Sequence, residues 1–168
     1  MIDNAAFGAI LDDGTLRFER LLPGPIERVW DYLTQRDLLA RWIAPFALPS
    51  TPGATFEHRW DGGGTLTGRI RIYDAPSVLE YDWNEGSAPG GPIEFTVVRF
   101  ELTPQGENVK LVLTHRLLPR NSYGTVAGGW HAHTDALIAA LRGAPAVDRD
   151  TRYEELAPSY RMRLDIGT

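Results

Sequence analysis

Hydrophobic residues follow two different periods along the chain, and the first stretch alternates as strands do. The segments AFGAIL and TLRFERLL lie on either side of Asp12-Asp13-Gly14. Aspartate and glycine favour tight turns, and alternation of apolar and polar residues is typical of half-buried strands. The pattern therefore predicts an N-terminal β-hairpin over about residues 5–22.

The segment after the hairpin predicts two short helices. Pro25 suits the start of a helix, and apolar residues follow it at helical spacing, at Ile26, Val29, Trp30 and Leu33. A second short helix is predicted over about residues 36–43. It ends before Pro45, because the residue preceding a proline is disfavoured in helical conformation.

Beyond the second helix the period changes to two, which predicts a run of antiparallel strands. The apolar-face positions of these strands are, in chain order, Phe56, His58, Trp60, Leu66, Ile70, Ile72, Leu79, Tyr81, Trp83, Val109, Leu111, Leu113, His115 and Leu117. The segment EGSAPGGP between two of the strands predicts a loop. In IEFTVVRFEL the apolar phase slips at Val97 and Val98, which predicts a β-bulge or a bend.

The last strong pattern is helical again and predicts a long helix over about residues 121–142. At about 100° per residue, one stripe of this helix is formed by Tyr123, Val126, Trp130, Thr134, Leu137 and Leu141. Asn121 or Ser122 suits its start, and Gly143 suits its end. Several glycines in its first half favour either a close approach to the sheet or a mobile segment. The tail, 144–168, is expected to hold one short helix and otherwise to cover the surface without adding to the core.

These elements predict one α+β domain over residues 1–143, because an apolar sheet face and an amphipathic helix bury each other. Strong curvature of the sheet would leave a cleft beneath the helix. Composition agrees with a globular protein, since the 168 residues are 43% hydrophobic and 23% charged. The net charge of −5 argues against nucleic acid or an anionic membrane surface as partner. The absence of cysteine, of a signal-peptide pattern and of a membrane-spanning stretch predicts a cytoplasmic protein.

Four segments resemble one protein family, in order and at its usual separations. They are LPGPIERVWDYLT, LLARWIAP, GRIRIYDAPSVLEYDW, and HRLL followed by GGWHAHTDALIAAL. Over about residues 14–142 the chain resembles bacterial SRPBCC proteins of the AHSA1-like (activator of Hsp90 ATPase homologue 1-like) group. The resemblance implies a helix-grip (Bet v 1/START-like) fold, in which a curved antiparallel sheet wraps a long C-terminal helix around a cavity. It leaves function open, because one fold serves many functions.

Histidines are the first candidates for chemistry. His131 and His133 lie about 200° apart on a helix, so they cannot share a metal ion, and no metal or cofactor is predicted. His133 is expected to point into the cleft, and His131 to face its rim or solvent. His58 and His115 lie on apolar strand faces, so three imidazoles could line one cavity. For each alone, a hydrogen-bonded structural role is the more frequent one.

Aromatic residues complete the predicted cavity, although each is equally well explained as core. Apolar walls with a few polar groups are typical of ligand pockets, and tryptophan or tyrosine suits a flat or amphipathic ligand. The full set of residues predicted to line the cavity is Trp42, His58, Trp60, Tyr81, Trp83, His115, Trp130 and His133.

Three functions remain open from sequence. The first is binding of a small apolar or aromatic molecule, with no catalytic residue assigned. The second is an enzyme of the same fold acting on a polyketide-like or aromatic substrate, with a cavity histidine as acid or base. The third is a chaperone- or stress-related interaction module, which a charged outer sheet face disfavours. Tyr153, Leu156 and Tyr160 in the tail leave open an apolar flap or a homodimer contact.

Overall fold

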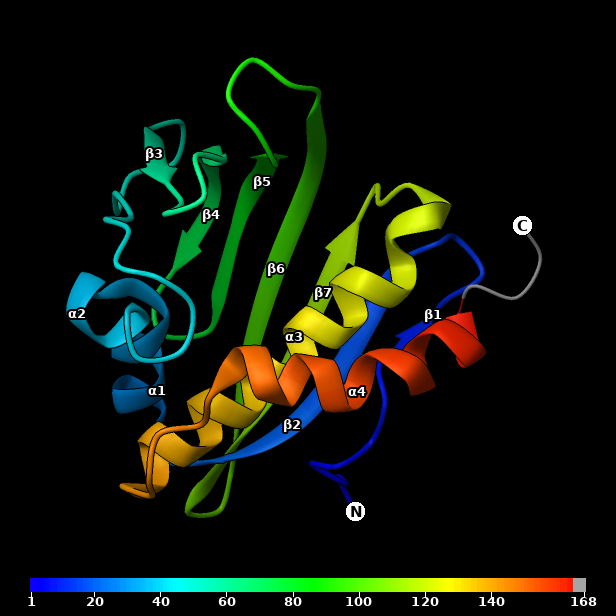
Figure 1. Cartoon of the computed structure of the whole chain (residues 1–168). Coiled ribbons are helices and arrows are strands. Elements are labelled where there is room, and N and C mark those ends of the chain that lie inside the picture. Colours follow the sequence, from blue (N-terminus) through cyan, green and yellow to red (C-terminus); the bar gives the residue numbers. More distant parts are fainter. Residues whose placement is uncertain (165–168) are drawn as a thin grey trace.

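A curved antiparallel sheet and a long helix laid across one of its faces make up the core of the computed structural model, which describes residues 1–164 (Figure 1). In this part of the chain the sheet has seven strands in the order β1-β2-β7-β6-β5-β4-β3. They are β1 (Ala9–Ile10), β2 (Leu16–Pro23), β3 (Thr55–Arg59), β4 (Thr65–Asp74), β5 (Val78–Gly86), β6 (Ile93–Gln105) and β7 (Asn108–Arg116). The predicted hairpin and the predicted run of strands are both confirmed.

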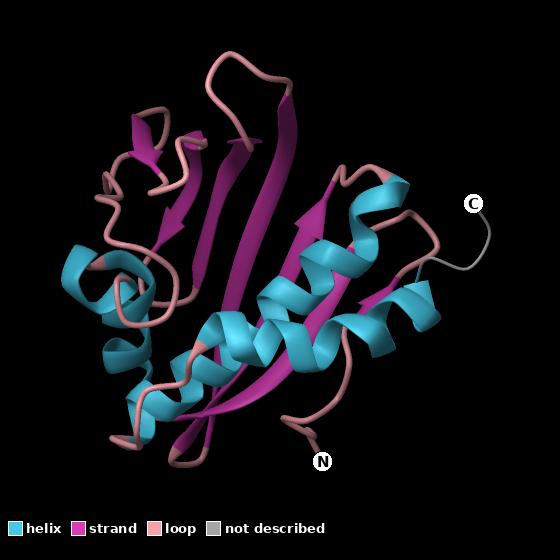
Figure 2. Cartoon of the chain, viewed as in Figure 1, coloured by secondary structure: helices cyan, strands magenta, loops and turns pink. Residues whose placement is uncertain are grey.

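Two long helices lie across one face of this sheet, and two short helices lie near its β3–β4 edge (Figure 2). The helical elements are α1 (Ile26–Thr34), α2 (Arg36–Leu39), the 3-10 turn η1 (Arg120–Ser122), α3 (Tyr123–Arg142) and α4 (Arg149–Leu164). The predicted long helix is α3, which begins after Ser122 and ends at Gly143 in left-handed conformation. α2 is shorter than predicted, because single hydrogen-bonded turns replace the helix after Leu39. The layout is the helix-grip fold.

The bulge predicted at Val97 and Val98 is wrong. β6 pairs with β5 and with β7 without interruption through both residues. Val98 faces the helix layer, whereas Val97 lies on the opposite face and is still only 2% exposed. Arg116 reaches from β7 across β6 to Glu80 on β5, and this side chain shields the outer face near Val97. The register irregularity that the described pairing contains lies in β4 instead.

The expectation that the tail adds little to the core is also wrong. α4 packs along α3, and Leu156, Ala157 and Tyr160 are buried between the two helices and the N-terminal segment. Tyr160 is 0% exposed, and its hydroxyl accepts a hydrogen bond from the backbone N–H of Gly8, 2.9 Å away. The few apolar residues of this helix are thus enough to cover one side of α3.

Candidate functional site

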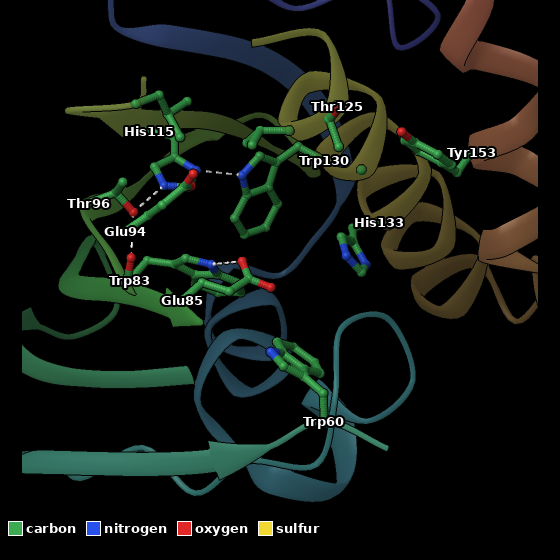
Figure 3. A pocket seen from close by; sticks show the side chains of 13 residues that line it. Trp60, Trp83, Glu85, Glu94, Thr96, His115, Thr125, Trp130, His133 and Tyr153 are labelled. Carbon is green, nitrogen blue, oxygen red and sulfur yellow. Dashed lines mark hydrogen bonds between the residues drawn. The ribbon is translucent and has the colours of Figure 1, made fainter. Parts of the chain in front are cut away.

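A cleft of about 350 Å³ lies between the sheet and the first half of α3 (Figure 3). Strands supply Trp83, Glu85, Glu94, Thr96 and His115; α3 supplies Thr125, Val126, Gly129, Trp130 and His133; Trp60, Leu118 and Tyr153 complete the lining. The pleat explains the strand contribution, since alternate residues of β5 and β6 face the helix. A side chain added at Gly129 would meet nothing within 4 Å, so this glycine leaves the cleft open beside α3.

Trp130 is fixed at the wall of the cleft by a chain of buried hydrogen bonds. Its indole Nε1–H donates to His115 Nδ1 at 2.9 Å, so the neutral ring carries its proton on Nε2. That nitrogen donates to Thr96 Oγ1 at 2.7 Å, and the hydroxyl donates to the backbone carbonyl of Trp83 at 2.5 Å. Burial lowers the pKa of His115 to about 3. His115 is therefore a neutral, fully bonded residue that orients Trp130.

His133 differs from His115 because it keeps one nitrogen available. It is half-buried, and its Nδ1–H donates to the backbone carbonyl of Trp42 at 2.7 Å. This bond fixes the tautomer and leaves a lone pair on Nε2. Burial lowers the pKa of His133 to about 4, against the opposing effect of the bond to Trp42. The ring is thus an uncharged hydrogen-bond acceptor at neutral pH.

Two carboxylates at the edge of the cleft were not among the predicted residues. Glu85 and Glu94 lie directly opposite each other on β5 and β6, and both are exposed. Glu85 accepts a hydrogen bond from Trp83 Nε1 at 2.8 Å. The segment EGSAPGGP predicted a loop that begins at Glu85, although the position of Glu85 continues the alternation of Tyr81 and Trp83. That alternation is the signal by which it could have been found.

Five of the eight predicted residues line this cleft, namely Trp60, Trp83, His115, Trp130 and His133. Trp42 and Tyr81 lie in the core instead. Trp42 is fully buried and donates from Nε1 to the carbonyl of Tyr32 at 2.8 Å. Tyr81 packs edge-on against Phe56, and burial raises the pKa of its hydroxyl.

His58, the eighth predicted residue, lines a neighbouring hollow of about 570 Å³. The two hollows share Trp60 and His133. Charged residues border this second hollow, at Asp61 and at 148–150. Within residues 1–164, no three histidine or acidic side chains gather closely enough to hold a metal ion.

The rim or solvent position predicted for His131 is wrong. Its side chain is 1% exposed and lies on the far side of α3 from the cleft, where α4 covers it. Nδ1 is 2.8 Å from the Tyr160 hydroxyl, while Nε2 is 3.9 Å from Asp135. Burial and the nearby Arg20 guanidinium lower the pKa of His131 to about 4. Helical geometry separated the two histidines correctly, but it could not reveal the helix that covers one of them.

Comparisons with solved structures identify close relatives in architecture. A Bordetella parapertussis protein solved by NMR is 35% identical, over 98% of this chain and 95% of that one, with a TM-score of 0.72. CalU16 from Micromonospora echinospora is 20% identical over 94% of each chain, with a TM-score of 0.70. The Aha1 dimer from Colwellia psychrerythraea is 17% identical over 76% of this chain and 95% of that one, with a TM-score of 0.63.

The family model that matches the chain agrees with these structures. The model that matches residues 23–142 describes the Activator of Hsp90 ATPase homolog 1-like protein. None of the curated proteins matches the chain. Among the described residues, no helix has the length and apolar character needed to cross a membrane. The match to the family model covers most of the chain, from the end of β2 to the end of α3. The chain therefore belongs to the Activator of Hsp90 ATPase homolog 1-like family.

Proposed function

We propose that the protein binds a small apolar or aromatic molecule in the cleft between the sheet and α3. The observation that carries this proposal is the wall built from Trp60, Trp83 and Trp130 around open space. The volume of about 350 Å³ falls within the range of small-molecule pockets. Trp83 and Trp130 already pack at 5.2 Å between ring centroids, so the wall is preformed.

Polar groups in the cleft suit recognition of an amphipathic ligand. The Nε2 of His133 offers an acceptor for a ligand hydroxyl, and the bond from Nδ1–H to the Trp42 carbonyl holds the ring in place. The indole N–H of Trp60 is enclosed by protein atoms, so it is not available as a donor to a ligand in the cleft.

A catalytic role is the second candidate, and the available Nε2 makes His133 a better candidate for it than His115, the other histidine of the cleft. The hydrogen bond to Trp42 holds this imidazole in one orientation, as a general base requires. Its lowered pKa makes it a weak base, however, so binding remains the preferred proposal.

The interaction-module alternative finds less support. Glu80 pairs with Arg99 and Arg116 on the outer sheet face, so much of that face is occupied by its own charges. A cytoplasmic location and a homodimer stay predictions. The described dimer of the Colwellia relative is the reason to keep the second of these in view.

The test combines a neutral probe with two substitutions at Gly129. Naphthalenemethanol, a bicyclic ring with one hydroxyl, is titrated into the protein and followed by NMR shifts of the tryptophan indoles. Gly129→Ala should retain binding and gain up to about 1 kcal/mol of stability, because alanine is the better helix former. Gly129→Leu should remain folded yet lose binding, since its side chain fills open space in the cleft.

Equal binding by the leucine variant, or no binding by the unmodified protein, would contradict the proposal. If the probe binds as expected, native mass spectrometry of the freshly purified protein gives the mass of any natural ligand that it retains.

A further inference from the structure

Within the described part of the chain, the side chains that line the cleft carry negative charge and no positive charge. Glu85 and Glu94 contribute carboxylates, while none of the other lining residues is a lysine or arginine. Within residues 1–164 neither carboxylate forms an ion pair; the ion pairs there involve other acidic residues. His115 and His133 are neutral at physiological pH because burial lowers the pKa of each. The cleft therefore disfavours an anionic ligand.

The position of the two carboxylates is electrostatically unfavourable. Glu85 and Glu94 are direct cross-strand partners, and like charges in that position destabilise a sheet. Elsewhere on the sheet, acidic residues are paired with arginines, as Glu80 and Asp82 are. The uncompensated pair thus occurs where the sheet borders the cleft.

Aromatic rings stand next to these charges. Trp83 donates its N–H to Glu85, so carboxylate and indole are held together. Glu85, Trp60 and Trp130 all line this cleft (Figure 3). A positive group placed there would meet both a carboxylate and the negative faces of tryptophan rings.

We propose that the ligand of this cleft is an organic cation: an aromatic or apolar molecule with an amine or quaternary ammonium group. The ammonium group lies near Glu85 and Glu94, and the apolar body lies against Trp60 and Trp130. This inference rests on the proposed binding function and specifies the chemical class of its ligand.

The experiment compares three probes that share one ring system and differ in charge. They are naphthylmethylammonium, naphthalenemethanol and naphthoate, each titrated by NMR at low salt. The cation should bind about tenfold more tightly than the alcohol, and the anion more weakly than the alcohol, because two carboxylates act on the charged group at short range. The doubly substituted Glu85→Gln/Glu94→Gln protein should bind cation and alcohol about equally.

A matched control removes the same charge elsewhere. Glu27→Gln/Glu107→Gln changes two acidic residues at the other end of the fold, near the β6–β7 turn, and should keep the preference for the cation. Unfolding of the Glu85→Gln/Glu94→Gln protein should occur at the same or a higher denaturant concentration, because a like-charge pair is gone.

The possible failures separate the two proposals. Equal affinity for all three probes, or tightest binding of naphthoate, would overturn the cation inference and leave ligand binding in place. An unchanged preference in Glu85→Gln/Glu94→Gln would overturn it as well. Failure of all three probes to bind would overturn the proposed function and this inference together.

Discussion

The two sides of α3 carry similar residues and have opposite structural roles. On one side, Gly129, Trp130 and His133 border an open cleft. On the other side, Gly128 and His131 lie under α4, and a side chain added at Gly128 would come within 3.0 Å of Tyr153. Each side thus has a glycine and a histidine. The covered side stabilises the fold, while the open side borders the cleft proposed to bind a ligand.

The difference lies in what covers each side rather than in the residues themselves. His131 is enclosed by Tyr160, Phe7 and Phe18, which leaves it no contact with solvent. Among the residues that the structure describes, His133 hydrogen-bonds only to the carbonyl of Trp42, and its ring stays half-buried. Residue type therefore does not distinguish the two histidines. The packing of α4 determines which of them is buried and which borders the cleft.

The largest expected effect comes from acid, which acts on both sides of α3. The pKa values of His115, His131 and His133 are lowered from 6.5 to about 3, 4 and 4. The unfolded chain then binds protons that the folded protein does not, so stability falls as the pH drops from about 6.5 toward 4. Urea unfolding at neutral pH and at about pH 5 measures this loss. An equal free energy of unfolding at both values would contradict it.

The next largest effect should follow from removing the side chain that closes the covered side. Tyr160→Ala deletes a fully buried ring and should lower the free energy of unfolding by about 3–5 kcal/mol. Tyr160→Phe, the control, keeps the ring and loses only the hydroxyl that bonds Gly8 and His131, at about 1–2 kcal/mol. Two losses of similar size, both below about 1 kcal/mol, would mean that α4 adds little to the core.

The two histidines give the smallest effect and the sharpest contrast. His131→Ala should cost about 2–3 kcal/mol, because it opens a cavity and removes a partner of Tyr160. His133→Ala should cost about 1 kcal/mol or less and should weaken binding of naphthalenemethanol. His131→Ala, where folded, should bind this probe as tightly as the unmodified protein does. Chemical denaturation and NMR titration check both variants. The reverse pattern would place the functional side of α3 under α4.

Much of the fold could be predicted from the two hydrophobic periods. The predictions that proved wrong failed for physical reasons. The α3 stripe around Trp130 predicted the helix and its ends, because burial of one face imposes helical spacing. The tail has only a few apolar residues among many charges, so its pattern predicted one short surface helix rather than the 16-residue α4 that packs on α3. The apolar Val97 suggested a bulge because an apolar residue was expected to face the core. Val97 faces outward instead, and Arg116, its neighbour on β7, shields it there.

The site was predictable in part for a similar reason. The pleat places Trp83 and His115 toward α3, and their facing could be counted from the sequence. The core positions of Trp42 and Tyr81 could not be distinguished from cleft positions, since both environments are apolar. Glu85 was missed because the glycines and prolines that follow it suggested that the strand had already ended.

Intermolecular NOEs locate a bound ligand and so test whether it occupies the cleft beside α3. With naphthalenemethanol bound, we expect NOEs from the naphthalene protons to the indole protons of Trp60 and Trp130. The rival apolar position is the outer face at the start of β6, where Phe95 is 69% exposed. NOEs to Phe95 and Ile93, with none to Trp60 or Trp130, would show that the ligand binds outside the cleft.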